Sequence, residues 1–119
     1  MRGDDLRNRT KRFALRVIKL VEALPKGKTP DVIGRQLLRS GTSVGANYRA
    51  ACRAKSAADF ISKMGTVEEE TDESIYWMEL LVDSGLMPQN IVYELQQEGE
   101  ELLAIIVSSI KTTKKTVNS

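Results

Sequence analysis

Residues 31–54 read DVIGRQLLRSGTSVGANYRAACRA, and this stretch decides the fold. Its apolar and small residues recur at steps of three and four, the period of one helix face, at Ile33, Leu37, Ser40, Val44, Tyr48 and Ala51. The middle, residues 40–46, is poor in helix formers, since each Gly costs about 1 kcal/mol relative to Ala. Because the period continues in phase on both sides, we expect one unbroken helix whose small residues let a second helix approach closely. The alternative is a phosphate-binding loop, but GTSVGAN lacks the Walker pattern and no strand is predicted before it.

Three further segments on either side have the same helical spacing. They cover residues 5–24, 57–85 and 89–112, and they are separated by a loop with Pro25 and Pro30, a capping-box-like start at Ser56 and the pair Met87-Pro88. We expect Thr29 or Asp31 to cap the helix over 31–54, Gly85 to end the helix over 57–85, and the tail from Lys111 to fray. Short loops make neighbouring helices antiparallel. The sequence therefore predicts an all-α, up-down-up-down four-helix bundle, with residues 1–119 as a single domain.

The expected core follows the 3-4 spacing of each segment. It consists of the face of residues 31–54 given above together with Leu6, Thr10, Phe13, Val17, Leu20, Leu24, Phe60, Met64, Val67, Thr71, Ser74, Met78, Leu81, Ile91, Leu95, Leu102, Ile106 and Ile110. Of the adjacent rings Tyr76 and Trp77, we expect one in the core and the other at a rim.

Composition excludes several classes of protein. The 119 residues contain no His, which removes Ser-His-Asp and Cys-His catalysis and His-ligated zinc. Cys52 is the only cysteine, so no intrachain disulfide can form; we expect a small buried residue and a reducing, cytoplasmic environment. The longest apolar run, residues 102–107, is far shorter than the roughly 20 residues that a bilayer span needs. The sequence predicts a soluble protein without a membrane partner.

Charge is unevenly distributed along the chain. Residues 1–55 contain 14 Lys and Arg against 4 Asp and Glu, whereas residues 56–110 contain 1 Lys against 12 acids. The basic helices of one copy can pair with the acidic helices of the next copy. Contacts of this kind join two different surfaces, and they can close into a ring. The sequence therefore predicts self-association.

Four arginines of residues 31–54 lie within an arc of about 80° on the expected helix. These are Arg35, Arg39, Arg49 and Arg53, with Thr42 and Ala46 between them. Lys26, Lys28 and Lys55 would extend this stripe at its ends. Because a guanidinium donates two parallel hydrogen bonds and stays charged, one interpretation is binding to the RNA or DNA backbone. The other is pairing with acids of a neighbouring helix, and the sequence leaves both open.

Acidic residues cluster in the second half of the chain. Two ExxE pairs, Glu70 with Glu73 and Glu98 with Glu101, resemble the paired acidic motifs of all-α nucleotide pyrophosphohydrolases, in which carboxylates bind Mg²⁺. ExxE arises easily by chance in acidic helices, and such runs are usually solvated or matched by arginine. We therefore predict no metal, no cofactor and no catalytic residue, and keep the Mg²⁺-dependent hydrolase as an alternative.

A more specific pattern combines three stretches of the chain. QLLRSGTSVGANYRAA at residues 36–51, SAADFISK at 56–63 and EETDESIYWMELL at 69–81 resemble the four-helix-bundle proteins encoded in intervening sequences of bacterial 23S ribosomal RNA genes. The resemblance covers about residues 10–85. The residues that match signature positions are Gln36, Arg39, Ser40, Ser43, Asn47, Asp59, Lys63, Glu69, Asp72, Glu73 and Trp77.

The resemblance implies a bundle that assembles into a ring, a homopentamer, with no established catalytic activity. It implies structural or interfacial roles for the signature residues. The family is also similar in fold to the accessory protein of diversity-generating retroelements, which binds nucleic acid and a reverse transcriptase, so a reverse transcriptase is a further candidate partner.

Overall fold

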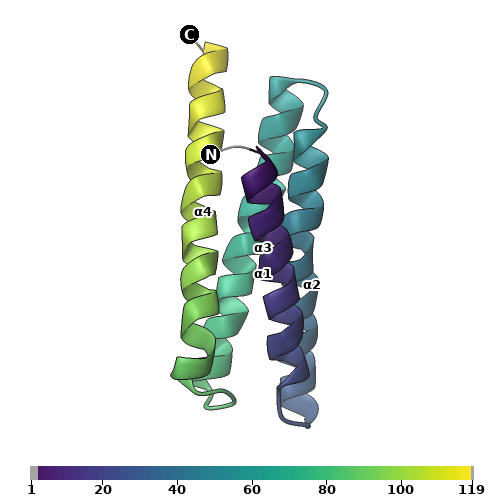
Figure 1. Ribbon diagram of the computed structural model, residues 1–119, viewed down its shortest axis with the longest axis vertical. Coiled ribbons are helices and arrows are strands. Elements are labelled where there is room, and N and C mark those ends of the chain that lie inside the picture. The colour runs from purple at the N-terminus through teal and green to yellow at the C-terminus, as the bar shows by residue number, and fades with distance from the viewer. Residues whose placement is uncertain (1–2, 119) are drawn as a thin grey trace.

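The computed structural model describes residues 3–118, and the side chains of residues 5–118. Four helices follow one another: α1 (Gly3–Glu22), α2 (Lys28–Cys52), α3 (Ala57–Asp83) and α4 (Gln89–Asn118). Figure 1 shows successive helices running in opposite directions along a rod of 51 × 20 × 20 Å. No strand occurs within residues 3–118. The predicted all-α, up-down-up-down four-helix bundle is confirmed.

The core is built from the residues that the 3-4 spacing selects. Phe13, Leu37, Met64 and Leu102, from the four helices in turn, are completely buried. Most of the expected core positions are buried with them, although Leu24 and Phe60 are only partly so. Ile91 is an exception, because it is 55% exposed and Val92 takes its place in the core.

The glycine-rich middle of α2 is helical, as predicted, and it lies against α1. A Cβ atom built on Gly41 would lie 2.8 Å from both methyl carbons of Val17, and one on Gly45 would lie 3.2 Å from Oγ1 of Thr10. Distances this short mean that the α1 and α2 backbones approach more closely than a larger residue allows. The predicted close helix packing therefore accounts for GTSVG, and the alternative of a phosphate-binding loop is not needed.

The helix ends differ most from the predicted bounds at the start of α2 and at the end of α4, whereas the other ends lie within two residues of them. α2 begins at Lys28 rather than Asp31, with Gly27 as its N-cap at φ 146°, so neither Thr29 nor Asp31 caps it. Pro30 lies in the first turn, where a missing N–H costs nothing because that donor has no partner within the helix. α4 continues to Asn118, so the tail from Lys111 is helical rather than frayed.

The other two junctions follow the sequence. Ser56 Oγ accepts a hydrogen bond of 3.0 Å from the Asp59 amide at the start of α3. The helix ends at Asp83, and Gly85 follows at φ 81°, a conformation that favours glycine.

The three sequential helix pairs pack extensively, whereas α1 and α4 touch over a shorter stretch. None of the helices over residues 3–118 combines the length and apolarity that crossing a bilayer requires. The cytoplasmic location remains a prediction.

Candidate functional site

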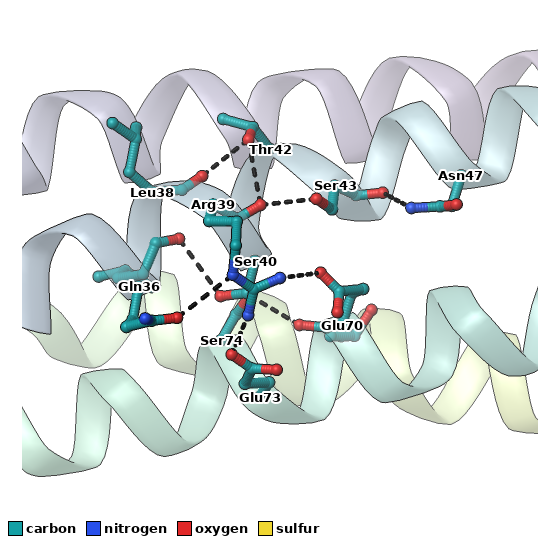
Figure 2. A network of polar contacts seen from close by, with 12 residues as sticks. Gln36, Leu38, Arg39, Ser40, Thr42, Ser43, Asn47, Glu70, Glu73 and Ser74 are labelled. Carbon is teal, nitrogen blue, oxygen red and sulfur yellow. Dashed lines mark hydrogen bonds and ion pairs between the residues drawn. The ribbon is translucent and has the colours of Figure 1, made fainter.

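Arg39 is the centre of a polar network between α2 and α3. Figure 2 shows its guanidinium directed at two carboxylates of α3: it donates to Glu70 at 3.0 Å and also to Glu73. Its Nε donates to Gln36 Oε1 at 3.2 Å. The Trp77 indole donates to the same Glu73 carboxylate at 2.9 Å. Arg39 thus joins α2 to α3, because it is hydrogen bonded to Gln36 on its own helix and to Glu70 and Glu73 on the other.

These contacts shift the pKa values of the Glu73 carboxyl and the Arg39 guanidinium. The hydrogen bond from Trp77, followed by that from Arg39, lowers the pKa of the Glu73 carboxyl below its usual value, although partial burial opposes the shift. The hydrogen bond to Glu73 raises the pKa of Arg39. Both groups are therefore charged at neutral pH.

Small polar signature residues of α2 lie beside this network. Ser74 Oγ of α3 donates to Ser40 Oγ at 3.0 Å in the interior, and Ser40 donates to the Leu37 carbonyl. Ser43 and Asn47 donate to backbone carbonyls one turn earlier in α2. The Ser40–Ser74 hydrogen bond thus joins α2 to α3, whereas Ser43 and Asn47 are satisfied within α2.

Asp59 and Lys63 form a second local structure at the start of α3. Asp59 accepts from the Lys55 amide at 3.1 Å and from Lys63 Nζ at 2.7 Å on both oxygens. Lys63, followed by the Lys55 amide, lowers the pKa of Asp59. This pair holds the turn between α2 and α3.

The two ExxE pairs each face an arginine. Glu70 and Glu73 hold Arg39, as described above. On the other side of the molecule, Arg9 of α1 donates to Glu98 of α4 at 2.7 and 3.1 Å and forms an ion pair with Glu101 at 3.2 Å. Among the residues that the structure describes, no group of three or more acidic or cysteine side chains gathers as metal ligands would. The geometry gives the hydrolase alternative no support.

A groove of about 660 Å³ runs between the outer sides of α1 and α2. Arg7 and Lys11 of α1 and Arg49 of α2 lie on its walls, and Thr42 and Ala46, predicted between the arginines, line it as well. Within residues 5–118, none of these three cations forms an ion pair. The groove therefore presents three uncompensated positive charges to solvent.

A smaller hollow of about 310 Å³ lies towards the other end of the same two helices. Lys26 and Arg35 line it together with Asp31, and neither cation pairs with that carboxylate. The remaining predicted cations, Arg53, Lys28 and Lys55, are exposed. We call the outward side of α1 and α2 that carries Arg7, Lys11, Arg35, Arg49 and Arg53 the cationic face.

The structure separates Arg39 from the other predicted arginines. Its two carboxylate partners occupy its guanidinium, so we leave it out of the cationic face. Arg35 and Arg39 lie within the same arc of α2, and the sequence alone does not show which flank of that arc α3 covers.

Arg7 and Lys11 of α1 are not among the cations predicted from the stripe on residues 31–54. A signal was available: both residues lie off the apolar spacing of α1, on the side that carries Ala14. Three lysines of α4 were also missed as candidates, because the tail was expected to fray. Lys111, Lys114 and Lys115 line a further open hollow on the last turns of α4.

Acidic residues occupy the outward side of α3. Glu69, Asp72, Glu79 and Asp83 are exposed and form no ion pair within the described part of the chain. The half-exposed Tyr76 lies among them and contacts the Trp77 ring edge-on at 5.1 Å. Trp77 packs partly buried against the core, as the prediction for this pair required.

The prediction for Cys52 is wrong. Its side chain is exposed, because it is the last residue of α2 and points away from the core that Ala51 enters.

Together, these features define a four-helix-bundle protein with a cationic face on α1 and α2, an acidic side on α3 and a polar network that locks α2 to α3. The chain belongs to the family of 23S rRNA-intervening sequence proteins, whose family model matches residues 5–108. The resemblance inferred from the sequence is therefore confirmed, and it extends into α4.

Among solved structures, the chain is similar to a protein with unknown function from the S23 ribosomal protein family of Bacteroides thetaiotaomicron VPI-5482. The two are 33% identical, with a TM-score of 0.86 over 93% of this chain and 99% of that one. No curated protein gives a significant match.

Proposed function

We propose that this protein is a non-enzymatic homo-oligomer that binds the backbone of RNA or DNA through its cationic face. The observation that carries the proposal is the groove between α1 and α2, where Arg7, Lys11 and Arg49 converge without a carboxylate partner. Grouped cations repel one another unless an anion neutralises them. A phosphate is suited to this place, because a guanidinium donates to two of its oxygens at once.

The cationic face is suited to phosphate contacts and not to sequence-specific recognition of bases. Phosphate contacts position a nucleic acid without reading its sequence, whereas specificity needs side chains that reach base edges. The cationic face consists of long, exposed cations on two straight helices, and it carries no projecting loop. Binding is accordingly expected to be largely independent of sequence and sensitive to salt.

Assembly is the second part of the proposal. Glu69, Asp72, Glu79 and Asp83 of α3 repeat at steps of three and four with Tyr76 between them, so they form one straight acidic stripe. A cationic surface of another copy, distinct from the cationic face, is the complement of this stripe. Such a contact joins two different surfaces and closes into a ring, for which the family resemblance suggests five subunits.

An alternative function is favoured by the Arg39 network, in which one arginine of α2 already pairs with carboxylates of α3. In that alternative the remaining arginines are consumed between subunits, and the protein is purely a structural oligomer. A reverse transcriptase is a further candidate partner, because of the similarity to the retroelement accessory protein.

The variant Arg35→Glu with Arg53→Glu distinguishes these functions. RNA and DNA binding is measured across a salt series, and the oligomeric state by light scattering, for this variant and the natural protein. Lost binding with an intact oligomer supports the proposal. Dissociation of the oligomer supports the structural alternative, and absence of binding by the natural protein even at low salt refutes the proposal.

A further inference from the structure

We infer that the nucleic acid bound by the cationic face is double-stranded. This inference rests on the proposed function and names its substrate class. It depends on three features: where the aromatic rings lie, how the cations are spaced, and what lines the groove between them.

The cationic face offers no ring on which a base can stack. Single-strand binders commonly combine cations with exposed aromatic side chains, because stacking contributes about 1–3 kcal/mol per base. The rings of α1 and α2 are Phe13, which is completely buried, and Tyr48, which is 6% exposed. The half-exposed rings, Tyr76 and Tyr93, lie on α3 and α4, outside the cationic face. Bases of a single strand would therefore remain in water.

The cations are held at fixed separations. Arg35 and Arg49 lie on the same helix 14 positions apart, which places their backbones about 21 Å apart along its axis. This distance exceeds the width of either groove of B-form DNA, about 12 and 6 Å. Arg35 and Arg49 can therefore reach phosphates on both sides of a groove.

A fixed separation of this kind favours a stiff ligand. A duplex holds its phosphates in place, so it loses little conformational freedom when both ends of the face are engaged. A flexible single strand must be ordered to make the same contacts, and that ordering weakens binding.

The floor of the groove consists of small residues. Ala14, Thr42, Gly45 and Ala46 lie between the cations, and Thr42 already donates to the Leu38 carbonyl at 2.7 Å. Such a floor admits the sugar and phosphate of a backbone between Arg7 and Arg49. Asn8 and Thr10 of α1 line the groove as well.

The test compares labelled duplexes with unstructured single strands. RNA and DNA duplexes of mixed sequence are used at about 20 base pairs, which for B-form DNA at about 3.4 Å per pair is much longer than the separation of the cations. The single strands are oligo(U) and oligo(dT) of the same length. At equal salt we expect both duplexes to bind at least about tenfold more tightly than their single-stranded counterparts.

A matched pair of variants tests the role of the spacing. Arg7→Glu with Lys11→Glu removes the two α1 cations that lie in the groove beside Arg49 and should reduce the ratio of duplex to single-strand affinity severalfold. Arg12→Glu with Arg16→Glu makes the same change in net charge on the same helix, on the flank of Arg9, and should leave that ratio unchanged. Light scattering checks that both variants keep the natural oligomeric state.

The outcomes separate this inference from the proposed function. Single strands that bind as tightly as duplexes would overturn the inference while leaving nucleic-acid binding intact. Equal effects of the two variant pairs on the ratio would also overturn it. If neither duplexes nor single strands bind, the proposed function itself fails.

Discussion

Replacing Gly41 with alanine tests the close packing of α1 against α2. The added methyl group would lie 2.8 Å from both Cγ atoms of Val17 and 3.1 Å from its Cβ. Val17 is completely buried, and a β-branched side chain has few alternative rotamers, so it cannot move aside easily. Overpacking of a core costs about 1–3 kcal/mol, and this site belongs near the upper end of that range. The gain in helix propensity on replacing Gly is about 1 kcal/mol. The net loss in the free energy of unfolding is therefore about 2 kcal/mol.

Gly65 provides the matched control, because it lies in the interior of α3 and a Cβ there would meet no atom within 4 Å. Gly65→Ala should keep the full propensity gain and stabilise the protein by about 1 kcal/mol. At about 4 °C per kcal/mol, Tm should fall by about 8 °C for Gly41→Ala and rise by about 4 °C for Gly65→Ala. Thermal and urea unfolding followed by circular dichroism, at one protomer concentration, measures both changes. If Gly41→Ala is as stable as the natural protein, or more so, the close-packing explanation of the GTSVG stretch is refuted.

Three further predictions concern the ion pairs and the acidic motifs. Because the pKa of Glu73 is lowered in the folded state, the stability that its ionisation contributes is present above the unfolded pKa of about 4.3 and is lost as pH falls through the folded pKa. Trp77→Phe removes the largest cause of this shift. In this variant the free energy of unfolding should depend less steeply on pH below about 4.3. An unchanged acid profile in this variant would contradict the assigned role of the indole. Arg9→Ala leaves the carboxylates of Glu98 and Glu101 without their partner and should destabilise the protein by about 1 kcal/mol or more. Arg12→Ala breaks no ion pair and should stay within about 0.5 kcal/mol of the natural protein. Urea unfolding measures both changes. Equal effects of the two substitutions would show that Arg9 contributes no more than an exposed arginine. Nucleoside triphosphates incubated with the protein and Mg²⁺ should be recovered unchanged by chromatography, since Arg39 and Arg9 occupy both ExxE pairs, and release of pyrophosphate would restore the hydrolase alternative.

The 3-4 spacing of apolar residues along the chain predicts most of the fold, because a helix in a bundle mainly has to bury one of its faces. Ser40 and Ser74 illustrate this point: each is polar, but the 3-4 period places both in the core, where they hydrogen bond to each other. The period also carried α2 through Gly41 and Gly45, although local propensity opposes a helix there. The helix is stable there because α1 packs against those glycines.

The helix ends were less predictable. Pro30 is compatible with either a loop or a first helical turn, and the choice depends on the backbone at Gly27. The tail after Lys111 has weak local preferences, yet its helix continues in register from Ile106 and Ile110.

The candidate site required knowledge of which helices are neighbours. Periodicity placed Arg35, Arg39 and Arg49 in one stripe, but it could not assign the flanks of α2 to α1 and α3. That assignment pairs Arg39 with Glu70 and Glu73, and it brings Arg7 and Lys11 beside Arg49. The exposure of Cys52 has a different origin, since it depends on where α2 ends.

The salt dependence of nucleic-acid binding tests the central claim most directly. Five cations of the face, if each neutralises one phosphate, give a slope of log K against log salt of about −4.5 for a duplex. Arg7→Gln with Lys11→Gln should reduce the magnitude of that slope by about 2, because two phosphate contacts are lost. A natural protein that shows no binding at about 50 mM salt, or a slope that these substitutions leave unchanged, would contradict the assignment of this surface to nucleic acid.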